Sequence, residues 1–136
     1  YYNDDFRKQI TGAKPIISVS SDSLTLKTHA FSRLKGVGSW ERKWTLTDET
    51  IILTDQIDGK GQHKISRFFH TTLPYEREAG GFKIGEIKLS TDDEVKHRPS
   101  KRWYAYGQSE PATTIEVTAL VDLPWSSSIK FEKSPD

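Results

Sequence analysis

The stretch Thr114–Leu123, with the sequence TIEVTALVDL, decides the fold class. Apolar side chains fill every second position of it, namely Ile115, Val117, Ala119, Val121 and Leu123. Most positions between them are polar, namely Thr114, Glu116, Thr118 and Asp122. A period of two is typical of a β-strand with one side in a core and the other in water. The sequence therefore predicts an antiparallel strand whose apolar side is buried.

Shorter runs with the same alternation recur along the chain, at 24–28, 40–46, 82–84 and 129–131. Breaks that contain Gly or Pro separate them, at 74, 79–81, 106–107 and 123–126. No segment of ten or more residues keeps an apolar stripe of helical period, and only 4–10 indicates a single helical turn. We predict about nine or ten strands in a two-layer antiparallel β-sandwich, with a closed β-barrel as the alternative.

Residues 40–73 hold three of the predicted strands in succession. Thr47-Asp48-Glu49 separates the first from the second, and Asp58–Gly61 (DGKG) separates the second from the third. Glycine adopts positive φ without steric cost, so the second separator is typical of a hairpin loop. We therefore predict that 40–73 form a contiguous three-stranded antiparallel meander.

The composition excludes several classes of protein. A chain of 136 residues corresponds to a single domain, here 1–136, and 4 Trp, 5 Tyr and 6 Phe are too many for a disordered coil. The net charge of only +1 argues against a polybasic nucleic-acid binder. No apolar run approaches the roughly 18 residues that span a membrane. Cysteine is absent, which excludes disulfides and thiolate metal sites.

Side chains that could carry chemistry are few. No two of the four histidines have the spacing of paired metal ligands on a helix, and no nucleophile motif occurs. Asp92-Asp93-Glu94 is the one acidic cluster, and a solvated turn explains it better than a calcium loop. His70, which follows Phe68-Phe69, is either a site histidine on a sheet surface or a histidine hydrogen-bonded within the fold. We expect no metal and no cofactor.

Two segments combine cations with aromatic rings. The segment Lys96–Tyr104 (KHRPSKRWY) suits acidic sugars, because arginine binds carboxylates or sulfates and aromatic rings stack on sugars. The alternatives are a nucleic-acid contact made by the same groups and an exposed charged loop before a strand whose aromatics enter the core. Trp40, Arg42 and Trp44 share one side of a predicted strand, which is either a glycan platform or a core face with the arginine paired to an acid.

Three motifs follow one another along the chain. The first motif is HAFSRLKGVGSWER at 29–42. The second consists of DQIDGKGQH at 55–63, RFFH at 67–70 and Pro74. The third consists of YAYG at 104–107 and Leu123-Pro124. In order and spacing they resemble motifs of the heparinase II/III-like polysaccharide lyases. The resemblance covers about residues 24–131.

The resemblance implies a fold and a function. Members of that family join an N-terminal α/α toroid, which supplies most of the catalytic groups, to an antiparallel β-sandwich. They are bacterial, periplasmic or secreted enzymes that depolymerise uronic-acid-containing polysaccharides by β-elimination. The chain is thus expected to be the C-terminal β-sandwich domain of a larger lyase and one wall of its glycan cleft. Its expected partners are an anionic polysaccharide and the parent's toroid, not nucleic acid or a membrane.

The chain departs from the family pattern in two respects. These 136 residues contain no toroid, and the family's catalytic Asn–His pair is absent, since Asn3 is the only asparagine. We therefore expect no catalytic residue here and no lyase activity from the domain alone. The expected substrate-binding residues are His70, Arg42, Trp44 and Tyr104. The alternatives are a non-catalytic carbohydrate-binding module and a structural or adhesion β-sandwich.

Overall fold

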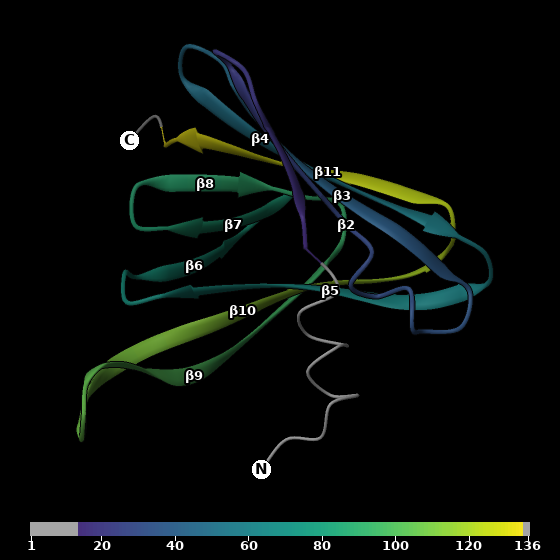
Figure 1. Cartoon of the computed structure of the whole chain (residues 1–136). Helices are drawn as coiled ribbons and strands as arrows, with labels where there is room; N and C mark the ends of the chain where they lie inside the picture. Colours follow the sequence, from purple (N-terminus) through teal and green to yellow (C-terminus); the bar gives the residue numbers. More distant parts are fainter. Residues whose placement is uncertain (1–13, 135–136) are drawn as a thin grey trace. The chain divides into compact units, whose positions relative to one another are not determined.

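A computed structural model describes residues 14–134 of the chain and shows strands and turns there but no helix (Figure 1). The strands are β1 (Ile16–Val19), β2 (Ser23–Thr28), β3 (Val37–Leu46), β4 (Thr50–Gly59), β5 (Gln62–Thr71), β6 (Tyr75–Glu78), β7 (Gly81–Ile84), β8 (Ile87–Ser90), β9 (Glu94–Ala105), β10 (Gln108–Asp122) and β11 (Trp125–Lys133). The prediction of an all-β fold is confirmed, with slightly more strands than expected. The helical turn predicted at 4–10 lies outside the described residues.

The strands form two antiparallel sheets, as in a β-sandwich. Hydrogen-bonded neighbours follow the order β1-β2-β3-β4-β11-β8-β7-β6 in one sheet and β5-β10-β9 in the other. No closed barrel occurs among residues 14–134, so the sandwich prediction is confirmed over its alternative. The predicted breaks at 74 and 106–107 fall between strands, and those at 79–81 and 123–126 begin between strands and end on the first residues of β7 and β11.

The chain divides into two compact units, each described here by itself. The first contains residues up to His63 together with Asp122–Ser128, and the second contains Lys64–Val121 with the residues from Ile129 onward. Strand β11 contributes to both. That residues 1–136 are one domain of a larger lyase stays a prediction.

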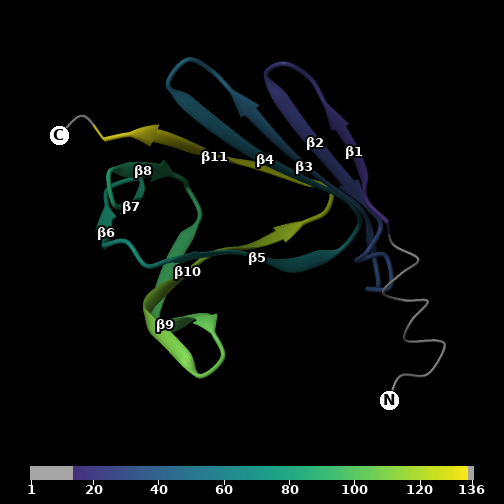
Figure 2. The ribbon, with the colours of Figure 1, turned by 60° about the vertical axis from the view of Figure 1, so that its left-hand side comes forward.

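In the first unit, β1 to β4 lie side by side as successive antiparallel neighbours (Figure 2). On β4 the side chains of Leu53, Asp55 and Ile57 are buried. Their cross-strand partners on β3 are Trp44, Arg42 and Trp40, in that order. The side of β3 that carries both tryptophans is therefore the side that faces the buried residues of this unit.

The meander predicted for 40–73 is wrong at its second half. The β3–β4 hairpin forms as expected, but β4 pairs next with β11, and β5 joins the other sheet beside β10. The backbone between β4 and β5 bonds to other segments, because Lys60 N donates to Gly36 O and Gly61 O accepts from Leu123 N. This segment is a corner between sheets, not a hairpin loop. The strand that pairs with β4 instead is β11, which begins at Trp125. Local sequence patterns carry no signal for a pairing between segments so far apart in the chain.

The core of the second unit contains the apolar side of β10. Ile115 and Val117 are buried there together with Val95 of β9 and with residues of β7, β8 and β11, namely Phe82, Leu89 and Ile129. Aromatic rings pack around this cluster, namely Phe69 of β5, Tyr75 of β6 and Phe131 of β11. The predicted buried face of this strand is thus confirmed at Ile115 and Val117.

The opposite side of β10 is less exposed to solvent than predicted. Thr114 and Thr118 are buried, although Leu120 on the same side is largely exposed. The reason is that β10 is the central strand of its sheet, with β5 and β9 on its two edges. Side chains of β5 reach over it, since His70 bonds to Thr114 and Ser66 to Thr118.

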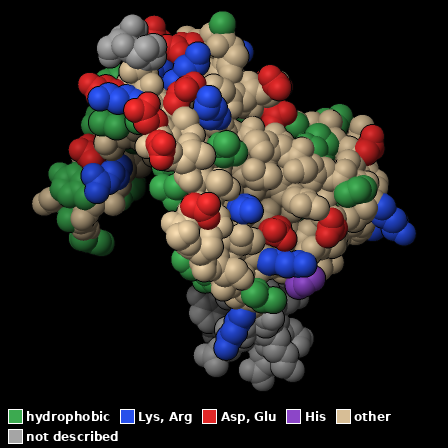
Figure 3. Space-filling view, turned by 90° about the horizontal axis from the view of Figure 1, so that it is seen from above, with side chains coloured by type: hydrophobic (Ala, Val, Ile, Leu, Met, Phe, Trp, Pro, Cys, Tyr) green, Lys and Arg blue, Asp and Glu red, His purple; other side chains and the backbone are tan. Residues whose placement is uncertain are grey.

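Charged side chains of both signs are interspersed on the face seen in Figure 3, as the net charge of +1 suggests. Hydrophobic side chains gather at the left-hand edge of that view. Within residues 14–134 no helix is long and apolar enough to cross a membrane.

Candidate functional site

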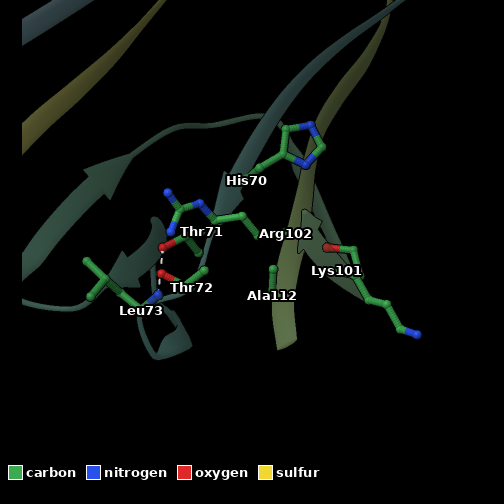
Figure 4. A pocket seen from close by; sticks show the side chains of 8 residues that line it. His70, Thr71, Thr72, Leu73, Lys101, Arg102 and Ala112 are labelled. Atoms are coloured by element: carbon green, nitrogen blue, oxygen red, sulfur yellow. Dashed lines mark hydrogen bonds between the residues drawn. The ribbon is translucent and has the colours of Figure 1, made fainter. Parts of the chain in front are cut away.

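A cavity of about 470 Å³ opens in the second unit where β5 ends (Figure 4). Three segments line it: the end of β5 and the following turn, the middle of β9, and one position on β10. The lining residues are His70, Thr71, Thr72, Leu73, Ser100, Lys101, Arg102 and Ala112. They include two cations, a histidine and three hydroxyls, and no carboxylate.

A chain of hydrogen bonds connects His70 to the far side of this cavity. His70 Nδ1 lies 3.0 Å from Thr114 Oγ1, and Thr114 Oγ1 donates to Ser100 Oγ at 2.9 Å. Thr114 is only 2% exposed, so this hydroxyl is shielded from water. The contacts join all three strands of the sheet, from β5 through β10 to β9.

The direction of these bonds indicates which nitrogen of the His70 ring carries a hydrogen. A hydroxyl has one proton, and Thr114 uses its proton toward Ser100. Thr114 Oγ1 can therefore only accept from His70, so Nδ1 carries a hydrogen and donates it. In the neutral ring Nε2 then holds the lone pair, and in the charged ring Nε2 is a second donor.

Arg102 is the cation that Figure 4 shows on the side of Thr71 and Thr72, whereas the Lys101 ammonium points away from them. Arg102 Nη1 donates to Glu110 Oε1 at 2.8 Å, which holds the guanidinium beside β10. One guanidinium offers five N–H donors, so others remain for a ligand. Thr71 Oγ1 accepts from Leu73 N at 3.0 Å, which leaves the proton of that hydroxyl for another acceptor.

Tyr104 lies in a different place, near the turn that joins β9 to β10. It lines a shallow depression with Trp103 and Tyr106, and all three rings are largely exposed, Trp103 at 63% and Tyr104 at 56%. Lys101 Nζ lies 5.8 Å from the centre of the Trp103 ring. The segment 96–104 is thus part of a strand and not a loop, and its aromatics do not enter the core.

Arg42 and Trp44 belong to the first unit. Arg42 binds Asp55 with two bonds, Nε to Oδ1 at 2.7 Å and Nη2 to Oδ2 at 3.0 Å, and its guanidinium lies 5.0 Å from the Trp40 ring centre. Trp40 Nε1 also donates to Asp55. Trp44 is half-buried between Leu24 and Leu53 of the neighbouring strands. The arginine thus lies over a ring and is paired to an acid, as one of the two interpretations expects.

The structure therefore brings none of the four predicted substrate-binding residues together in one cavity. His70 and Tyr104 line separate depressions of the second unit, and Arg42 and Trp44 lie in the first. Substrate contact by these four residues stays a prediction.

One member of the acidic cluster at 92–94 is engaged in the fold, and the other two are exposed. Asp93 Oδ2 accepts from Arg67 Nη2 at 2.7 Å, and the Arg67 side chain is almost fully buried. Between residues 14 and 134 no group of three or more His, Asp or Glu side chains is placed to hold a metal ion.

Sequence reasoning missed Thr114, Ser100 and Arg102 as neighbours of His70. The alternation in 114–123 did place Thr114 on the polar side of its strand. The sequence does not predict the register between β5 and β10, which places Thr114 beside His70, 44 residues away. Ser100 and Arg102 fell within the basic and aromatic segment, but only the pairing of β9 with β10 brings them to this cavity.

No protein-family profile and no curated protein matches the sequence. Solved structures do match the fold. Two structures of heparinase III superpose with TM-scores of 0.68 and 0.67 at 15% and 14% identity, over 90% of this chain and 22% of theirs. The heparan sulfate lyase HepC from Pedobacter heparinus matches with a TM-score of 0.58 at 8% identity, over 91% of this chain and 22% of that one.

This chain has the fold of one region of those lyases. The expected resemblance is confirmed at the level of the fold, over nearly the whole chain. The chain spans about a fifth of the length of each of these proteins, and identities of 8–15% carry no residue roles across.

Proposed function

We propose that this chain is the β-sandwich region of a heparinase III-like polysaccharide lyase and contributes one wall of its glycan cleft. The parent is a periplasmic or secreted bacterial enzyme that cleaves uronic-acid-containing polysaccharides by β-elimination. Its toroid supplies the catalytic groups, and the sandwich binds the acidic chain. The fold match to heparinase III over 90% of the chain carries this proposal.

The chemistry of the second unit supports an acidic ligand. The cavity beside His70 is lined by cations and hydroxyls without a carboxylate. Three exposed aromatic rings follow on the same hairpin, where they can stack on sugar faces. Three basic side chains between residues 98 and 102 of β9 are exposed, namely Arg98, Lys101 and Arg102.

The test is a binding titration of the 136-residue chain with heparan sulfate and with dextran, a neutral polysaccharide. We expect heparan sulfate to bind and dextran not to bind. The affinity for heparan sulfate should fall steeply as the salt concentration rises, because salt screens the attraction between the basic side chains and the acidic polysaccharide. If neither polysaccharide binds at low salt, the proposed function is wrong.

A carbohydrate-binding module without any lyase partner is the second candidate. The exposure of Trp103, Tyr104 and Tyr106 at the β9–β10 turn favours it, because such modules bind sugars through exposed rings. Such a module would bind dextran or another neutral glycan through these rings. Loss of that binding in Trp103→Ala, with heparan sulfate binding unchanged, would favour the module over the lyase region.

A further inference from the structure

We propose that the cavity at the end of β5 is a subsite for one oxyanion of a sugar chain, either a sulfate ester or a carboxylate. The inference rests on the proposed function and deepens it, since it names the group of the substrate that this part of the sandwich holds. It follows from the hydrogen-bond donors that the fold leaves available in the cavity.

Two of the hydroxyls that line the cavity use a lone pair within the fold and keep their protons. Ser100 Oγ accepts from Thr114, and Thr71 Oγ1 accepts from the backbone of Leu73. Because a hydroxyl has one donor and can accept at two lone pairs, both side chains retain an O–H to donate. A ligand that accepts hydrogen bonds and donates none fits such a lining.

The relay from His70 strengthens one of these donors. Nδ1–H of His70 donates to Thr114, and Thr114 donates to Ser100. Hydrogen bonds that run head to tail polarise one another, so the Ser100 hydroxyl at the end of the relay is a better donor than an isolated serine. The burial of Thr114 keeps water from breaking the relay in the middle.

Arg102 supplies the charge. Its contact with Glu110 holds the side chain while other N–H groups of the planar guanidinium stay open. Glu110 is not among the lining residues, and no other carboxylate is. Planar N–H pairs on arginine match the oxygens of sulfates and carboxylates, and such charge-assisted bonds are about twice as strong as neutral ones.

The experiment measures the affinity of the 136-residue chain for three probes by calorimetry at fixed low salt. The probes are a heparan sulfate hexasaccharide, the same hexasaccharide desulfated and N-acetylated so that only its carboxylates remain charged, and inorganic sulfate. The variants are Ser100→Ala and Arg102→Gln. Arg102→Lys keeps the charge without the planar donors, and Lys96→Gln removes one exposed charge from the same strand outside the cavity.

We expect Ser100→Ala and Arg102→Gln each to weaken binding of the sulfated hexasaccharide about tenfold, the usual value of a hydrogen bond to a charged group. Arg102→Lys should fall between Arg102→Gln and wild type, and Lys96→Gln should stay within about twofold of wild type, as exposed rim charges do. The three substituted side chains, Ser100, Arg102 and Lys96, are on the surface or line the cavity, and unchanged thermal melts would show that the variants fold.

The probes identify the oxyanion. If the subsite takes a sulfate ester, desulfation removes the effect of both substitutions and inorganic sulfate competes with the hexasaccharide. If it takes a carboxylate, the desulfated probe shows the same losses. Either result supports the subsite. If wild type binds the hexasaccharide while Ser100→Ala and Arg102→Gln bind equally well, the subsite is wrong and the proposed function stands. If wild type binds no probe, both are wrong.

Discussion

His70 owes its orientation to a buried threonine. Histidines in functional sites are more often oriented by a carboxylate or a backbone carbonyl. Here the Thr114 hydroxyl donates its one proton to Ser100, so toward the His70 imidazole it can only accept. The consequence is a fixed tautomer, with the hydrogen on Nδ1 and Nε2 open.

The tautomer can be measured directly. We predict that neutral His70 has its hydrogen on Nδ1, seen as a protonated Nδ1 and an unprotonated Nε2 in a long-range ¹H–¹⁵N correlation spectrum. Thr114→Val removes the acceptor and keeps the shape, so the Nε2–H form should then gain population. A wild-type spectrum dominated by Nε2–H would contradict the assigned bond directions. Thr113→Val, one position along, is the control.

Asp55 is the residue whose loss should damage the first unit most. It is 1% exposed and accepts from Trp40 and twice from Arg42. Asp55→Ala leaves a mostly buried guanidinium and an indole N–H without this acceptor, which should cost about 3 kcal/mol in denaturant melts. Asp58→Ala removes an exposed carboxylate that accepts only from Ser39 and should cost at most about 0.5 kcal/mol. Equal costs would show that the Asp55 cluster does not stabilise the fold.

At the scale of single strands, β10 could be predicted from the sequence and the place of β5 could not. Five alternating apolar residues predict the strand and its buried side wherever it pairs. The segment 62–73 was also predicted as a strand. Whether it pairs with β4 or with β10 depends on contacts between segments that are far apart in the sequence. The hydrogen-bond partners of His70 could not be predicted for the same reason. The register between β5 and β10 depends on the whole sheet and not on either strand alone.

The buried side of β10 gives a sharp stability test. Val117 is 1% exposed within the core of the second unit, so Val117→Asp places a carboxylate among apolar side chains. The expected loss is about 3–5 kcal/mol, a large share of a domain's stability. Glu116→Ala, on the other side of the strand, should change the melt by about 0.5 kcal/mol or less. The reverse order would mean that the strand buries the other face.

The corner between β4 and β5 depends on Gly59. Its φ is +141°, and a Cβ there would lie 2.1 Å from Gly36 O, closer than any real contact. Gly107 also has positive φ, +71°, but a Cβ there would meet nothing within 4 Å. Gly107→Ala should therefore cost about 1 kcal/mol of backbone strain, and Gly59→Ala clearly more. Equal costs in thermal or denaturant melts would contradict the close approach at the corner.

At the scale of the whole chain, the fold match and the length of the matched proteins lead to one expectation about activity. The chain covers about a fifth of the length of heparinase III, and Asn3 is its only asparagine. We predict no rise in ultraviolet absorbance from unsaturated uronate product when the 136-residue chain is incubated with heparin, heparan sulfate or alginate. A steady rise that His70→Ala abolishes would show that the sandwich itself is catalytic.

The surface that contacts the glycan can be located by ¹H–¹⁵N chemical-shift mapping of the 136-residue chain during titration with a heparan sulfate hexasaccharide. If the sandwich contributes a wall of an acidic-glycan cleft, the largest shifts should fall on β5 near His70, on β9 from Arg98 to Tyr104, and on the facing part of β10. Shifts confined to β1–β4, or none at millimolar hexasaccharide, would contradict that assignment.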